Sequence, residues 1–348
     1  MSEDMPPESE KPVIEIDNLK VHFQVREGVV RAVDGVSLKL MPGEVLGIVG
    51  ESGSGKSITV RAIMQLLPKV GKISDGQILF NGVPGKTTDI AKLDRNGRDM
   101  RALRGGRIGM IFQEPMTALS PVHTIGHQVM TPILLHSQGS KADAEKRARE
   151  VLDMVRLPRI DEMMRSYPHQ LSGGMRQRAM IAIALACRPQ VLIADEPTTA
   201  LDVTTEAQIL DLLKELRAEL GMSIIFITHN FGVVADIADR VSVMYLGNVV
   251  ETGRTEDIFY DPKHPYTRAL LNSIPRLGAA KQHRLNTIPG MIPDPFNLPD
   301  GCVFHPRCGL ARDGDCRRIY PAVTRIDDER MARCHVVAEA MQAGSVAQ

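Results

Sequence analysis

The sequence has no tryptophan, few aromatic residues and no excess of charge of either sign. Lysine and arginine together number 42, as do aspartate and glutamate, so the formal net charge is zero. Nucleic-acid-binding proteins usually carry a basic excess, so this balance argues against nucleic acid as a partner. The chain also lacks any apolar run of the roughly 18–20 residues that a membrane span needs. The longest run, Ala179 to Cys187, is bracketed by Arg178 and Arg188.

Cysteine is scarce as well, and its distribution is uneven. Cys187 stands alone, whereas the other four cysteines lie close together near the C-terminus. In a reducing compartment such a group indicates a metal site more often than disulfides. The acidic, proline-containing start resembles neither a signal peptide nor a core element. We therefore expect residues 1–12 to form a disordered tail on a cytoplasmic protein.

The apolar content of 43% over 348 residues is ample for a packed core. Residues 13–40 alternate in places like strands, and residues 44–50 form a short apolar run that is typical of a buried strand. Two more such runs, 191–194 and 223–228, come much later. Strands that alternate with helices predict a mostly parallel, doubly wound α/β core.

A helical segment interrupts this strand pattern between Thr124 and Arg165. Ser140 followed by Asp143 predicts a capping box, and apolar residues then repeat at helical spacing. After about residue 255, proline and polar residues become more frequent and strand-like runs end, so we place a domain boundary there. No internal repeat is visible, which indicates a single copy of the fold.

Residues 50–57 fit the phosphate-binding loop pattern and stand between a predicted strand and a predicted helix. Glycines there let backbone N–H groups turn toward phosphates, and the helix N-terminus favours an anion. Lys56 would reach the β- and γ-phosphates, and the Ser57 hydroxyl would hold Mg²⁺. The alternative, a chance glycine-rich turn, does not explain the strand and helix on either side. The expected nucleotide-binding residues here are Gly50, Glu51, Ser52, Gly53, Ser54, Gly55, Lys56 and Ser57.

The apolar run 191–194 ends in two carboxylates. Asp195 is placed to support Mg²⁺, and Glu196 to polarise the attacking water. Many strands end in acidic turns, so this interpretation depends on the phosphate loop upstream.

Residues 171–177 read Leu-Ser-Gly-Gly-Met-Arg-Gln. Ser172 can cap the following helix, and the two glycines leave backbone N–H groups exposed as a second anion site. This stretch resembles the signature of ABC ATPases, with methionine where glutamine is commoner. The resemblance implies a P-loop NTPase fold, namely an ATPase domain over 13–255 with a RecA-like core, an antiparallel β subdomain and a helical subdomain at about 116–170. The signature residues are Leu171, Ser172, Gly173, Gly174 and Met175.

The same resemblance assigns roles to four further residues. Gln113 is similar to the Q-loop glutamine that contacts Mg²⁺ and faces the membrane partner, and Asp202 to the D-loop aspartate. His229 resembles the switch histidine on the γ-phosphate, which with Glu196 would form the catalytic pair. Phe23 matches the aromatic that stacks on adenine, although a core position would explain it equally. In such cassettes ATP lies between the phosphate loop of one subunit and the signature of another, so hydrolysis requires a dimer.

The C-terminal region narrows the resemblance. Residues 263–270 and 302–308 resemble the ATPase subunits of bacterial oligopeptide/dipeptide importers, whose relatives carry nickel, opines or oligosaccharides. The resemblance covers residues 13–334 and implies ATP-driven peptide import at the cytoplasmic face of the inner membrane. It also implies four kinds of subunit: this ATPase, a second, related ATPase in a heterodimer, two membrane permeases and, indirectly, a solute-binding protein. The DNA-repair ATPases that share these motifs split them with long coiled coils, which are missing between Ser57 and Leu171.

The same resemblance gives residues 256–348 as a small C-terminal domain in which the four cysteines hold a [4Fe-4S] cluster. Thiolates suit iron–sulfur or zinc. Their spacing matches neither the ferredoxin run nor a zinc ribbon, and buried structural thiols are the alternative. We expect this domain to shape contacts with the partner ATPase or permease, and it need not reach the ATP site for that role. The expected ligands are Cys302, Cys308, Cys316 and Cys334.

Overall fold

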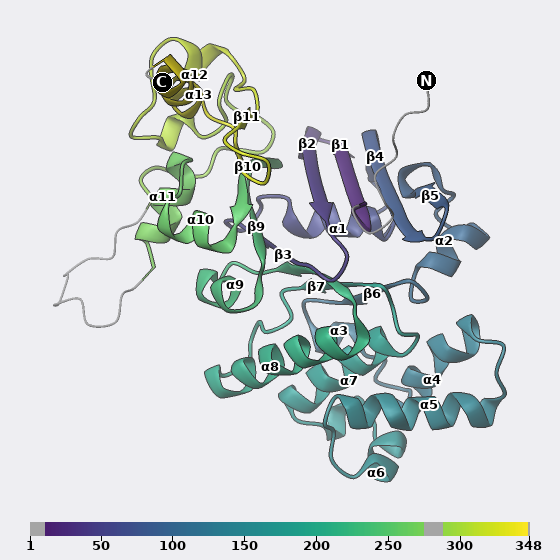
Figure 1. Ribbon diagram of the computed structural model, residues 1–348. Coiled ribbons are helices and arrows are strands. Elements are labelled where there is room, and N and C mark those ends of the chain that lie inside the picture. The colour runs from purple at the N-terminus through teal and green to yellow at the C-terminus, as the bar shows by residue number, and fades with distance from the viewer. Residues whose placement is uncertain (1–10, 275–287, 347–348) are drawn as a thin grey trace.

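The computed structural model describes residues 11–274 and 288–346, so residues 1–10 of the expected 1–12 tail lie outside the described residues (Figure 1). A central sheet has the strand order β11-β12-β10-β9-β3-β8-β7-β6. Strands β9, β3, β8, β7 and β6 run parallel to one another, as the apolar runs predict. Its strands are β3 (Val45–Val49), β6 (Ile108–Ile111), β7 (Val191–Asp195), β8 (Ser223–Ile227), β9 (Arg240–Tyr245), β10 (Asn248–Arg254), β11 (Thr324–Arg325) and β12 (Met331–Ala332).

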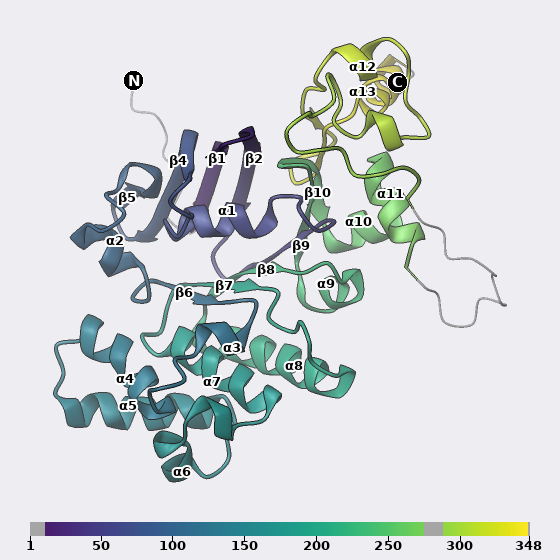
Figure 2. The same cartoon turned by 180° about the vertical axis from the view of Figure 1, so that it is seen from behind.

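A second, antiparallel sheet has the order β2-β1-β4-β5. It lies on the opposite side of the central sheet from helices α4 to α8 in both views (Figures 1 and 2). The second sheet is the expected antiparallel β subdomain, whereas the helical subdomain at about 116–170 stays a prediction. The strands of the second sheet are β1 (Ile14–Val25), β2 (Gly28–Leu40), β4 (Gly71–Val83) and β5 (Lys86–Asp89).

The helices follow from local capping and from burial against the sheets. Ser140 and Asp143 form the predicted capping box at the start of α5. Among the described residues, no helix is long and apolar enough to cross a membrane. The α-helices are α1 (Lys56–Ile63), α2 (Arg98–Leu103), α3 (Pro115–Ala118), α4 (Ile125–His136), α5 (Lys141–Met154), α6 (Ile160–Arg165), α7 (Gly173–Leu185), α8 (Val203–Leu220), α9 (Phe231–Ile237), α10 (Thr255–Tyr260), α11 (Pro265–Asn272), α12 (Asp315–Arg318) and α13 (His335–Val346).

The central strands are buried on both faces, which explains their continuous apolar runs. In β8, Ile224 and Phe226 pack with the helices α7 and α8, whereas Ile225 and Ile227 pack with α1 and the antiparallel sheet. This alternation is the two-residue period of a strand. The carboxyl ends of β3, β7 and β8 therefore meet at one edge, where the loops that follow them converge.

The part of the chain after residue 255 also enters the central sheet, contrary to the expectation that strands end there. Glu251 and Thr252 of β10 pair with Ala332 and Met331 of β12. Backbone hydrogen bonds of β10 that would otherwise form an open sheet edge are satisfied in this way. The two parts of the chain share a sheet across residue 255. The domain boundary proposed there stays a prediction.

Candidate nucleotide site

The phosphate loop connects β3 to α1, as predicted, and two of its glycines have conformations that other residues rarely adopt. Gly50 has φ 153° and Gly55 has φ 99°. A Cβ atom would lie 2.2 Å from the Met244 carbonyl oxygen at position 50, and 2.5 Å from the Ala32 carbonyl oxygen at position 55. Only glycine fits at both positions, because the backbone approaches other backbone there.

Lys56 is the first residue of α1 and is folded back into the loop. Its Nζ donates to the carbonyl oxygens of Gly50 at 2.8 Å and Glu51 at 3.0 Å. Burial lowers the pKa of this ammonium group, while the charges of Glu196, Asp195 and Glu51 act in the opposite direction. A cation is thus held inside the loop without a carboxylate partner, where a phosphate oxygen can replace the carbonyls.

Ser57 and Asp195 meet at the edge of the central sheet. The Ser57 hydroxyl donates to Asp195 Oδ1 at 2.8 Å. Asp195 is buried, its Oδ2 has no hydrogen-bond partner, and burial raises the pKa of its carboxyl group. An unpartnered carboxylate oxygen beside a hydroxyl is the hard oxygen donor set that Mg²⁺ prefers. Ser57 and Asp195 therefore fit the predicted Mg²⁺ site.

Glu196 is the centre of a hydrogen-bonded group at the end of β7. Its Oε2 accepts from Gln113 Nε2 at 3.1 Å and from the Thr199 hydroxyl at 3.0 Å, and its Oε1 lies 3.3 Å from His229 Nδ1. The backbone of Glu196 has φ 48°, a left-handed conformation that is costly for this residue type. The structure thus brings together Glu196, Gln113 and His229, and adds Thr199, which no sequence motif had indicated.

A pocket of about 420 Å³ adjoins the phosphate loop and contains Gln113 and Glu196 in its lining. Phe23 also lines it and is half-buried, with part of its ring against the core below the antiparallel sheet. Both interpretations of Phe23, nucleotide contact and core residue, are therefore compatible with its position. Pro295 and Leu298 line the same pocket, although nothing in the sequence had linked the C-terminal region to it.

The signature residues lie apart from this pocket, since none of them lines it. Ser172 is the N-cap of α7, as predicted, and its hydroxyl accepts from Met175 N at 3.4 Å. Asp202 caps α8, and its carboxylate accepts hydrogen bonds from Thr205 N at 2.9 Å and from Thr205 Oγ1 at 2.7 Å. These hydrogen bonds lower the pKa of Asp202. Within one chain, the signature does not complete the nucleotide pocket.

The C-terminal region reaches the phosphate loop, which its expected role in subunit contacts did not require. Arg307 forms two hydrogen bonds with the Glu51 carboxylate, Nη1 to Oε2 at 2.7 Å and Nη2 to Oε1 at 3.1 Å. The hydroxyl of Tyr266 also accepts from Glu51 N at 3.0 Å. Residues far apart in sequence meet here because β9 and β10 carry the chain back past the loop.

The four C-terminal cysteines lie near one another, but not in the arrangement of a single-ion site. Burial raises the pKa of Cys302 to about 11, and the nearby thiols of Cys334, Cys316 and Cys308 add to that rise. Cys302 N also donates to the Cys316 carbonyl oxygen at 2.9 Å. Over the described ranges, however, no three His, Cys, Asp or Glu residues are placed to hold a metal ion. Four thiols are donors of the kind that an iron–sulfur cluster uses. The metal centre at these cysteines stays a prediction.

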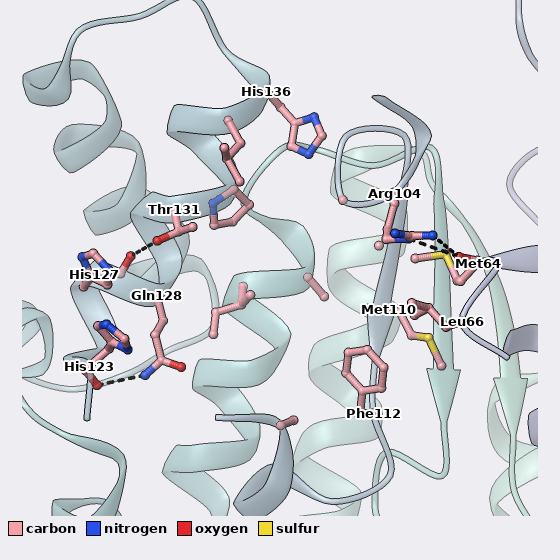
Figure 3. Close-up of a pocket in the computed structure, with 17 residues that line it drawn as sticks. Met64, Leu66, Arg104, Met110, Phe112, His123, His127, Gln128, Thr131 and His136 are labelled. Carbon is pink, nitrogen blue, oxygen red and sulfur yellow. Dashed lines mark hydrogen bonds between the residues drawn. The ribbon is translucent and has the colours of Figure 1, made fainter. Parts of the chain in front are cut away.

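A second pocket, of about 550 Å³, opens between α4 and the central sheet (Figure 3). Figure 3 shows His127 and Gln128 of α4 on one side, and Met64, Leu66 and Phe112 on the other. Phe112 immediately precedes Gln113, so this groove adjoins the residue that contacts Glu196. The groove is lined largely by apolar side chains.

Comparisons with known proteins agree with this geometry. The family description "ABC transporter" matches residues 33–199, and "Oligopeptide/dipeptide transporter, C-terminal region" matches residues 250–316. A putative peptide import ATP-binding protein of Brucella abortus is 49% identical over 94% of this chain and 97% of its own length. The dipeptide transport ATP-binding protein of Escherichia coli is 46% identical over 93% of this chain and 96% of its own length.

Solved structures give the same result for the fold. The dimeric ATP-binding cassette MJ0796, in a post-hydrolysis state with ADP and phosphate, matches with a TM-score of 0.61 and 31% identity. The match covers 70% of this chain and 98% of that one. Fold and site together define an ABC cassette ATPase. The chain belongs to the ATP-binding proteins of the oligopeptide/dipeptide ABC import family.

Proposed function

We propose that this chain binds and hydrolyses ATP to power the import of oligo- or dipeptides through an ABC transporter at the cytoplasmic face of a bacterial inner membrane. The observation that carries the catalytic part is the carboxylate of Glu196, which contacts both Gln113 and His229 beside the phosphate loop. The peptide cargo rests on relatives that are named for peptide and dipeptide transport.

Each residue of the site has a role in this reaction. Lys56 moves from its two carbonyl partners to the β- and γ-phosphates. Ser57 and Asp195 would hold Mg²⁺, which would neutralise phosphate charge. Glu196 orients a water molecule and accepts its proton as the water oxygen bonds to the γ-phosphorus. The bond from that phosphorus to the bridging oxygen breaks, which leaves ADP and phosphate. His229 lies beside Glu196, where it can donate to the γ-phosphate.

Hydrolysis needs a second ATPase subunit in this proposal. The signature at the start of α7 exposes backbone N–H groups but does not line the pocket of its own chain. A partner's signature would therefore close the pocket, and the related cassette MJ0796 has been solved as a dimer with ADP and phosphate. We propose that the partner is a related ATPase and that the subunits form a heterodimer.

We further propose that the groove in Figure 3 receives a cytoplasmic helix of a permease subunit. Leu135 lines the groove with 76% of its surface exposed, so it is available to an apolar partner. Leu135→Glu should prevent co-purification with the permeases and leave ATP binding unchanged. Tyr260→Glu, at a large hydrophobic residue on α10 that is more exposed still, is the control. Unchanged co-purification of Leu135→Glu would exclude this groove.

The cargo is tested in vesicles that contain the permeases, the two ATPases and the binding protein. ATP-dependent uptake of labelled dipeptide, which should be lost with Glu196→Gln in this chain, supports the proposal. Uptake of nickel, an opine or an oligosaccharide in place of peptide would keep the motor role and change the cargo. ATP hydrolysis with no uptake of any solute would contradict the transport function.

We also propose, from family resemblance and from their proximity, that Cys302, Cys308, Cys316 and Cys334 hold an iron–sulfur cluster. Four thiols are its usual donor set. Anaerobic purification, metal analysis and visible absorbance test this. One equivalent of zinc would overturn the iron assignment, and the lack of either metal would leave buried structural thiols as the explanation.

A further inference from the structure

The phosphate loop contains a negatively charged residue, Glu51, immediately after Gly50. A carboxylate at this position is unfavourable for nucleotide binding, because ATP brings several negative charges to the same loop. Glu51 is also one of the groups whose charge acts on Lys56, the cation that must be released to the phosphates. An unpaired Glu51 would both repel the phosphates and compete with them for Lys56.

The structure neutralises this carboxylate from the C-terminal region. Arg307 contacts both Glu51 oxygens, at 2.7 and 3.1 Å, in the parallel two-bond geometry that favours arginine over lysine. Only 4% of the Arg307 side chain is exposed, against 24% for Glu51, so water screens this pair weakly. The pairing raises the pKa of Arg307, which keeps it charged.

The guanidinium is itself held in place by a backbone carbonyl and by a cluster of buried aromatic rings. Its Nε donates to the Pro289 carbonyl oxygen at 3.2 Å, and its carbon lies 5.8 Å from the centre of the Tyr245 ring. Tyr245 packs against Tyr266 and Phe304, with ring centres 4.6 and 5.3 Å away. Tyr266 also accepts from Glu51 N, so two groups from this region fix Glu51.

A second part of the same region lines the nucleotide pocket directly. Pro295 and Leu298 lie in the lining with Phe23 and the phosphate loop. Between them, the Phe296 ring lies close to Gly28, the first residue of β2, since a Cβ atom at that glycine would be 3.6 Å from it. The C-terminal region therefore contacts the phosphate loop through Arg307 and lines the pocket through Pro295 and Leu298.

We propose that Arg307 is a positioning residue for ATP binding: it neutralises Glu51, so that the phosphate loop presents Lys56 to the phosphates without competition from the Glu51 carboxylate. The C-terminal region, which matches the oligopeptide/dipeptide transporter family, is then also part of the nucleotide site. This inference rests on the nucleotide pocket assigned under the proposed function.

The test measures the ATP Kd of the full chain with Mg²⁺ by calorimetry, in a Glu196→Gln background that prevents turnover. Arg307→Gln should raise the Kd by about ten- to a hundredfold, the range expected when a charged hydrogen-bonded pair is broken. Adding Glu51→Gln to that variant should return the Kd to within about threefold of the parent. A loss of packing around Arg307 would not be rescued by removing the charge of Glu51, and the unfolding temperature of each variant shows whether the fold itself has changed.

Two controls make the result decisive. Arg312→Gln removes an exposed arginine of the same region, which pairs with Glu339, and should leave the Kd unchanged. If Arg307→Gln does not fold, Arg307→Lys replaces it: lysine keeps the charge but loses the two-bond geometry, so the Kd should rise by about three- to tenfold and should fall back when Glu51→Gln is added. An unchanged Kd for the Arg307 variant, or no rescue in the double variant, would each overturn the inference. A parent that binds no ATP would instead refute the nucleotide site.

Discussion

His229 Nδ1 lies 3.3 Å from Glu196 Oε1. This contact joins the loop after β8 to the end of β7. This contact forms because neighbouring parallel strands place their carboxyl ends at one edge of the sheet. It leaves the second Glu196 oxygen to Gln113 and Thr199. The carboxylate is therefore oriented from both sides, as a group that positions a water molecule must be.

Glu196→Gln should keep ATP binding and reduce turnover to below about a tenth of the wild-type rate, since proton transfer by a positioned carboxylate contributes at least that much. Glutamine keeps the side-chain size and can still bond to Gln113 and Thr199. Nucleotide affinity and phosphate release are measured on the same preparation. Turnover above this level would show that another residue is the base.

Ser172→Arg should leave ATP binding intact and prevent the ATP-dependent dimer, because the signature acts across the interface and not in its own pocket. Sedimentation of the Glu196→Gln protein with ATP measures this. Ser140→Arg is the matched control, since Ser140 also caps a helix through its side chain but lies outside the signature. A stable dimer with Ser172→Arg would refute the trans arrangement.

Phe23→Ala should raise the ATP Kd about fivefold or more, the smallest effect expected from losing one aromatic stacked on a base. Phe23→Tyr should bind as the wild type does. Ile73→Ala removes a partly buried residue of the same core that does not line the pocket, so it should lower the unfolding temperature alone. A lower unfolding temperature with unchanged Kd for Phe23→Ala would identify it as a core residue only.

Acid should destabilise the protein through His264, which caps α11. Burial lowers the pKa of His264 to about 3 from its ordinary 6.5. Between these values the unfolded chain binds more protons than the folded one, so the free energy of unfolding falls as the pH falls. His264→Asn keeps a capping side chain without the titration. Its unfolding temperature should fall less than that of the wild type between about pH 7 and about pH 5. Equal falls would exclude His264 as the cause.

The motifs in the sequence predicted the parallel core, the phosphate loop and three residues that meet at the end of β7, namely Gln113, Glu196 and His229. They could do so because each is a local pattern: Lys56 and Ser57 start a helix after a buried strand, and Asp195 and Glu196 end another. Once the strands are parallel and adjacent, their carboxyl ends converge. The meeting of Ser57 with Asp195, across 138 residues, therefore follows from sequence.

Only the tertiary structure decided what lies around that group. Arg307 and Glu51 are 256 residues apart, and neither stands in a pattern that predicts the other. Their pairing depends on β10 and β12 bringing the C-terminal region beside the phosphate loop, and on the ring packing that fixes Arg307. The arrangement of the four thiols likewise depends on loops, whose path cannot be predicted from a periodic sequence pattern. Residues that act together within one motif can be predicted from their short spacing in the sequence. Pairs of side chains that are distant in sequence depend on how whole helices and strands pack.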